Sequence, residues 1–103
     1  MILMIIRKKF ELDPNLEFIK VVIDIEKEIL SAICELHVDC YEELVETGSE
    51  AKNLWGANLF PNEKRIDFIS MINIRPKDKN FDMEIKIPEI KNRVESIIKK
   101  LLF

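Results

Sequence analysis

The chain has 103 residues, of which 48% are hydrophobic and 34% charged, with a formal net charge of −3. These values exclude intrinsic disorder and predict one globular domain, residues 1–103, with a single modest core. No apolar run approaches the roughly 20 residues that cross a bilayer, and an acidic chain is a poor partner for nucleic acid, so neither membrane nor nucleic acid is an expected partner.

The two cysteines, Cys34 and Cys40, match no metal-ligand spacing and suit a reducing compartment. On a buried strand face Cys34 would be a small core residue. The N-terminal run MILMII is too short for a signal peptide, and its basic residues follow it. We therefore expect a cytoplasmic protein. Seventeen isoleucines, no glutamine and many Lys and Glu give a thermophile-like composition, which an A/T-rich genome also produces.

After an apolar run at 1–6 that predicts a buried strand, the stretch 18–39 fits two periods. As a helix it has an apolar stripe at spacings of three and four, and as a hairpin it alternates around a polar loop at 24–28. Its many β-branched residues favour the hairpin. In the second strand the apolar residues from Leu30 to Val38 alternate with a polar face that carries Glu35, His37 and Asp39.

The next elements are marked by capping and turn residues. Asp39, as N-cap, and Glu42 predict a helix at 40–47, which Gly48 would end in a left-handed conformation. A strand is expected at 54–60. Because Gly56 interrupts it, we expect a bulge or the close approach of another group at this point.

The last part of the chain predicts a strand at 65–75, a charged loop at 76–82, a short edge strand at 83–87 and an amphipathic helix at 88–102 that begins with Pro88. The fold class is therefore α+β. We expect a mostly antiparallel sheet of about 4–5 strands, with a short middle helix (40–47) and the C-terminal helix (88–102) packed on one face.

Glu35, His37 and Asp39 share one strand face in this prediction, which would suit a divalent metal or acid–base chemistry. The alternative is structural: Asp39 caps a helix, Glu35 pairs with a lysine, and His37 is the only histidine. We expect no metal and no cofactor, with these three residues as the only ligand candidates.

Four further polar or aromatic residues are candidates for binding. Trp55 and Asn58 flank Gly56, and Trp55 either stacks on a ligand or packs in the core. Asn73 and Arg75 either clamp an anion, or Arg75 pairs with an internal acid such as Glu35 or Asp39. If the two predicted strands turn their polar faces to the same side, all seven residues converge.

Three blocks of sequence resemble a family of small uncharacterised prokaryotic proteins, a domain of unknown function. They are VVIDIEKEIL with CELHVD at 21–39, GS with NLWGANLFP at 48–61, and ISMINIRP at 69–76. The resemblance covers roughly residues 20–103 and contains no known catalytic motif. It differs at Cys34, where the family pattern has glycine. It implies that the following residues fall at motif positions: Glu35, His37, Asp39, Ser49, Trp55, Gly56, Asn58, Ser70, Asn73 and Arg75.

These patterns favour a non-enzymatic module that binds a small ligand or a protein partner, possible partners including a second copy of the chain. Ile69 and Met71 lie on an otherwise polar strand face, and exposed apolar groups there would mark an interface. The alternative is a small hydrolase or metal-assisted enzyme in which His37 acts with Glu35 or Asp39 and Arg75 holds an anionic substrate. A third hypothesis makes the polar cluster a buried hydrogen-bond network.

Overall fold

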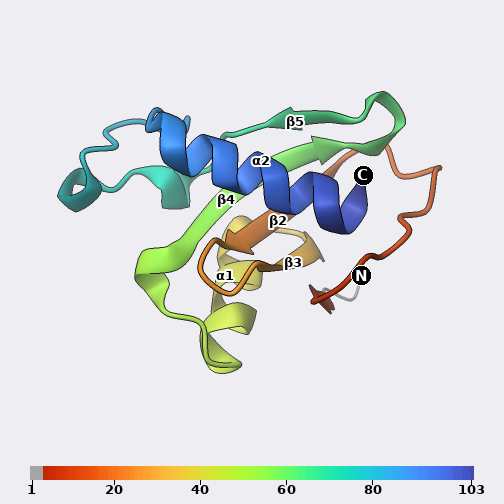
Figure 1. The fold of residues 1–103 in the computed structure, drawn as a ribbon, viewed down its shortest axis with the longest axis horizontal. Helices are drawn as coiled ribbons and strands as arrows, with labels where there is room; N and C mark the ends of the chain where they lie inside the picture. The colour runs from red at the N-terminus through yellow and green to blue at the C-terminus, as the bar shows by residue number, and fades with distance from the viewer. Residues whose placement is uncertain (1–3) are drawn as a thin grey trace.

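The computed structural model describes residues 4–103 and shows an antiparallel sheet with a helix on each face (Figure 1). The strands lie in the order β1-β3-β2-β4-β5. The α+β prediction is confirmed, as are the C-terminal helix and a short middle helix. The element bounds are β1 Met4–Ile6, β2 Ile19–Asp24, β3 Ile29–Cys34, α1 His37–Glu46, β4 Leu54–Phe60, β5 Arg65–Asp67 and α2 Pro88–Leu102.

The hairpin of β2 and β3 is the centre of the sheet and is buried on both sides. Val21 and Ile23 pack with α2 on one face, and Val22 packs with α1 on the other. This double burial explains why Val21, Val22 and Ile23 are apolar in succession, because a strand covered on both faces accepts apolar residues at every position. No helix within residues 4–103 combines the length and apolarity that a membrane span requires.

The second strand of the hairpin ends earlier than the sequence predicts. The pairing with β2 skips Ile33, which has a left-handed φ of +64°, so Ile33 forms a bulge. The extra residue turns Cys34 from the α2 face, where Ala32 lies, to the α1 face. The predicted strand through Val38 is therefore wrong beyond Cys34, and α1 begins at His37 instead of residue 40.

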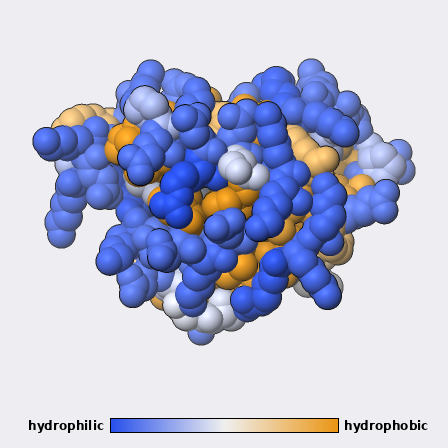
Figure 2. Space-filling view, in the orientation of Figure 1, coloured by the Kyte–Doolittle hydropathy of each residue, from blue (hydrophilic) through white to orange (hydrophobic). Residues whose placement is uncertain are grey.

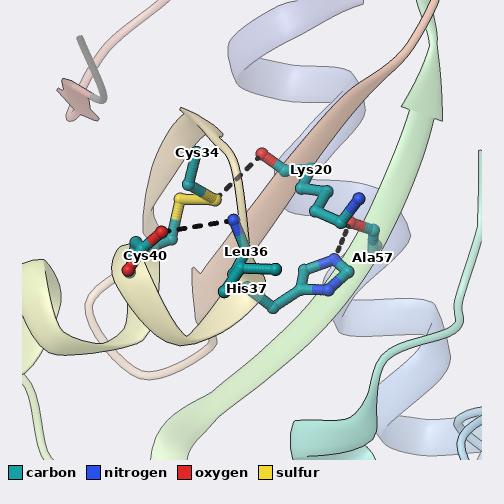
Figure 3. The surroundings of a disulfide bond; sticks show 7 residues. Lys20, Cys34, Leu36, His37, Cys40 and Ala57 are labelled. Atoms are coloured by element: carbon teal, nitrogen blue, oxygen red, sulfur yellow. Dashed lines mark hydrogen bonds between the residues drawn. A yellow bond between two sulfur atoms is a disulfide. The ribbon is translucent and has the colours of Figure 1, made fainter. Parts of the chain in front are cut away.

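Cys34 and Cys40 form a disulfide between the end of β3 and the first turns of α1, with Cα atoms 5.8 Å apart (Figure 3). The two residues are 5% and 0% exposed, so the predicted burial of Cys34 is confirmed. The expectation of reduced cysteines is corrected, because the bulge at Ile33 turns Cys34 toward α1.

The chain after β5 also departs from the prediction. The strand predicted at 65–75 ends at Asp67, and the chain continues through 3₁₀ turns at Met71–Asn73 and Pro76–Asp78. No strand forms at 83–87, where a single bridge joins Ile69 to Glu84. The segment 69–83 is instead a folded loop at the end of the molecule where β5 leads toward α2 (Figure 1).

Reduction of the disulfide should destabilise the protein by about 2 kcal/mol, because opening a loop of this length returns chain entropy to the unfolded state. Urea unfolding with and without a phosphine reductant measures this difference. The Cys34→Ser/Cys40→Ser variant is the control and should not respond to reductant. Equal midpoints for the native chain in both conditions would contradict a closed disulfide.

Candidate functional site

His37 is the first residue of α1, and its imidazole points toward β4 (Figure 3). Its Nε2 lies 2.8 Å from the carbonyl oxygen of Ala57. Because a carbonyl only accepts hydrogen bonds, Nε2 carries the proton and Nδ1 is the basic nitrogen. The side chain is half-buried.

Burial lowers the pKa of His37 below its ordinary value of 6.5, and the nearby charge of Lys20 lowers it further. The hydrogen bond to the Ala57 carbonyl opposes this lowering of the pKa more strongly than Lys20 adds to it but less than burial causes, and the side chain of Asn58 opposes it least. The neutral form of the imidazole therefore predominates at pH 7. A neutral imidazole with Nδ1 unprotonated is chemically able to accept a proton or bind a metal.

The other two residues predicted beside His37 do not share a strand face with it, because α1 has already begun. Glu35 is exposed in the turn before the helix and makes no ion pair within residues 4–103. Asp39 caps the helix, but from its third position: its Oδ2 accepts from the backbone N–H of Leu36 at 3.3 Å. Nowhere in the described chain do three His, Cys, Asp or Glu residues gather as a metal site would require.

Asn73 is completely buried and is bonded to the backbone of β4. Its Oδ1 accepts from the N–H of Gly56 at 2.8 Å, and its Nδ2 donates to the carbonyls of Gly56 and Met83, both at 3.0 Å. The predicted close approach at Gly56 is confirmed: a Cβ there would lie 2.5 Å from the Cβ of Ser70.

Asn80 is a second buried asparagine that sequence reasoning missed. It is 0% exposed, donates to the carbonyls of Asn73, Asp82 and Glu84, and accepts from the N–H of Lys86 at 2.8 Å. It lies in a charged stretch without periodicity, so no sequence signal distinguishes it from a solvated loop residue. Together the two asparagines fix the shape of the loop 69–83.

Arg75 is held within the protein. Its Nη1 donates to the carbonyl of Leu54 at 2.5 Å, Nη2 donates to the carbonyl of Lys52, and Nε donates to Asp78 at 2.9 Å. Its guanidinium lies 4.1 Å from the ring centre of Trp55, which is 1% exposed. Arg75 therefore does pair with an internal acid, but the acid is Asp78.

The candidate residues form two groups along β4. His37 bonds to the carbonyl of Ala57, with the side chain of Asn58 beside it. Arg75 bonds to the carbonyl of Leu54, which precedes Ala57 by three residues on β4. At about 3.3 Å per residue the two groups are roughly 10 Å apart along the strand. Asn58 connects the first group to the loop by donating to the carbonyl of Ile69 at 3.3 Å.

A cleft of about 660 Å³ lies between α1 and the loop, on the sheet face opposite α2. Beside it the loop exposes large apolar side chains. Ten such residues are exposed among residues 4–103, and five of them lie in this loop: Ile69 39%, Met71 73%, Ile74 42%, Phe81 70% and Met83 42%. In Figure 2 apolar colour appears at the left end of the molecule, where Figure 1 places the chain between β5 and α2. The cleft is lined by Tyr41, Ala51, Lys52, Ile72, Arg75, Pro76, Lys77 and Asp78.

The fold and these features define a small α+β protein with a structured apolar loop beside an open cleft. The chain belongs to the family described as protein of unknown function (DUF5674), whose model matches residues 6–101. Comparison with curated proteins gives no significant match, and comparison with solved structures gives none either.

The lowered pKa of His37 predicts a specific pH dependence of stability. As the pH falls, His37 of the unfolded chain takes up a proton near pH 6.5, whereas His37 of the folded protein takes it up only at a lower pH. The free energy of unfolding therefore decreases as the pH falls from about 7 through 6.5 toward the pKa of the folded state. The His37→Gln variant should lose less stability over this interval. Because the chain has one histidine, its imidazole NMR signal titrates without overlap. A midpoint at or above 6.5 would show that the ring is not desolvated.

Proposed function

We propose that this protein is a non-enzymatic binding module whose protein partner contacts the apolar surface of the loop 69–83. The observation that carries the proposal is the exposure of five large apolar side chains within this one segment. Exposed apolar groups gathered in this way are typical of interaction sites. Met71 and Phe81 are the most exposed, at 73% and 70%.

The loop is preformed, which favours binding. Asn73 and Asn80 donate to carbonyls of its backbone from inside. Arg75 joins it to Lys52 and to Leu54, the first residue of β4. A surface that is already ordered loses little conformational entropy when a partner binds. Within this ordered loop, Met71 and Phe81 remain exposed while Asn73 and Asn80 are buried.

The alternative, a hydrolase or metal-assisted enzyme at His37, has less support. The imidazole has the right protonation for a general base. However, the three donor nitrogens of Arg75 are already bonded, and Arg75 bonds to β4 roughly 10 Å from the position of His37. Nothing else in the described chain places a cation beside the imidazole to hold a substrate anion, except Lys20.

Affinity capture from a lysate of the source cells, followed by cross-linking mass spectrometry, tests the proposal. The native chain should recover a defined protein, and Met71→Glu and Phe81→Glu should each lose it. Phe10→Glu is the matched control, because Phe10 is exposed to 38% outside the loop, and it should retain the protein. Equal recovery by all four chains, or no specific recovery by the native chain, would contradict the proposal; thermal midpoints confirm that each variant is folded.

A further inference from the structure

Helix α1 carries an apolar stripe whose first and last residues are exposed and whose middle residue, Tyr41, is partly buried against the core. Val38, Tyr41 and Val45 are spaced by three and four residues, so they lie along one side of the helix. Val38 and Val45 are 42% and 41% exposed, and Tyr41 lines the cleft. The buried side of the helix is a different one, formed by Cys40 and Leu44.

The loop provides the opposite wall of this cleft. Ile72 and Pro76 face the side of α1 that bears Tyr41, and the cleft between them measures about 660 Å³. The cleft is therefore an apolar groove with a helix as one wall and part of the loop 69–83 as the other. An amphipathic helix is a common occupant of such a groove.

Helix α1 carries an excess of negative charge. The helix carries four acids and no Lys or Arg, and its last turn has no basic residue. Glu42, Glu43 and Glu46 make no ion pair with the described residues. Glu43 and Glu46 also lie near the C-terminal end, where the helix dipole disfavours negative charge. A cation from outside the chain would relieve both effects.

The loop has the opposite imbalance. Lys77 lines the cleft, Lys79 follows two residues later, and neither is ion-paired within residues 4–103. Arg75 is neutralised by Asp78, so these two lysines are the free positive charges of this wall. The acids of α1 and the two lysines of the loop thus both lack ion-pair partners within residues 4–103.

We infer that the occupant of this groove is α1 of a second copy of the chain. The inference rests on the proposed function, because part of the loop 69–83 forms one wall. In a two-fold dimer the Val38–Tyr41–Val45 stripe of each copy lies in the groove of the other, and Glu42 and Glu46 face Lys77 and Lys79 across the interface. The contact is self-complementary, as an isologous dimer requires.

Charge-reversal variants in the full chain test the inference, with sedimentation velocity at a series of concentrations as the measurement. The native chain should be a dimer. Glu42→Lys/Glu46→Lys and Lys77→Glu/Lys79→Glu should each raise the dimer Kd by about tenfold or more, because each places like charges opposite one another. An equimolar mixture should restore dimers, because in the mixed dimer both sets of contacts are again attractive.

Two control variants make the same changes in net charge elsewhere: Glu11→Lys/Glu17→Lys and Lys8→Glu/Lys9→Glu, at exposed positions outside the groove. Both should dimerise like the native chain. A monomeric native chain at about 1 mM, dimers unaffected by the groove variants, or a mixture that stays monomeric would each overturn the inference. Binding of an unrelated acidic helix or a small anion by a monomer would overturn it too. In all these cases the lysate test with Met71→Glu still decides the proposed function separately.

Discussion

The structure depends on the pair of hydrogen bonds between the carboxamide of Asn73 and the backbone of Gly56. The amide donates to the carbonyl and accepts from the N–H of the same residue, as a neighbouring strand would. Because Gly56 has no Cβ, Ser70 can lie directly against it. A side chain thus continues the sheet at the point on β4 where β5 no longer pairs, since the register of those two strands begins at Asn58 and Asp67.

The exposed surface follows from this arrangement. The loop 69–83 is fixed by hydrogen bonds to its backbone. The side-chain amides that make them belong to Asn73 and Asn80, and both residues are 0% exposed. Ile72 packs against the core on the α1 face, whereas the other large apolar side chains of the loop are exposed, Met71 most of all. Buried amides with all their hydrogen bonds made stabilise one conformation of a loop, and here that conformation leaves five large apolar side chains exposed. The hydrogen bonds of Asn73 and Arg75 agree with the third hypothesis from the sequence, a structural network, whereas binding at the exposed side chains around them stays a proposal.

Sequence periodicity predicted the regular elements. The stripe of α2, the hairpin loop and the bounds of β4 follow from residues whose local preference and burial agree. The bulge at Ile33 was not predictable, because a β-branched residue rarely adopts a positive φ and only tertiary contacts select it. That one residue moved Cys34 to the other face, ended the strand and separated Glu35, His37 and Asp39. The strand predicted at 65–75 was too long for a similar reason. Ile72 and Ile74 alternate with polar residues as in a strand, but so few residues do not distinguish a strand from the 3₁₀ turn that forms at Met71–Asn73.

Amide hydrogen exchange on the Asn73→Ala variant tests the central role of the Asn73–Gly56 pair most directly. Losing buried hydrogen bonds worth about 3 kcal/mol should speed exchange about a hundredfold at Gly56 and at the loop amides of Ser70 and Arg75, with β3 amides nearly unchanged. Asn92→Ala, at an exposed position on α2, is the control and should exchange like the native chain. Unchanged exchange in the loop of Asn73→Ala, or acceleration spread evenly over the whole sheet, would contradict the account.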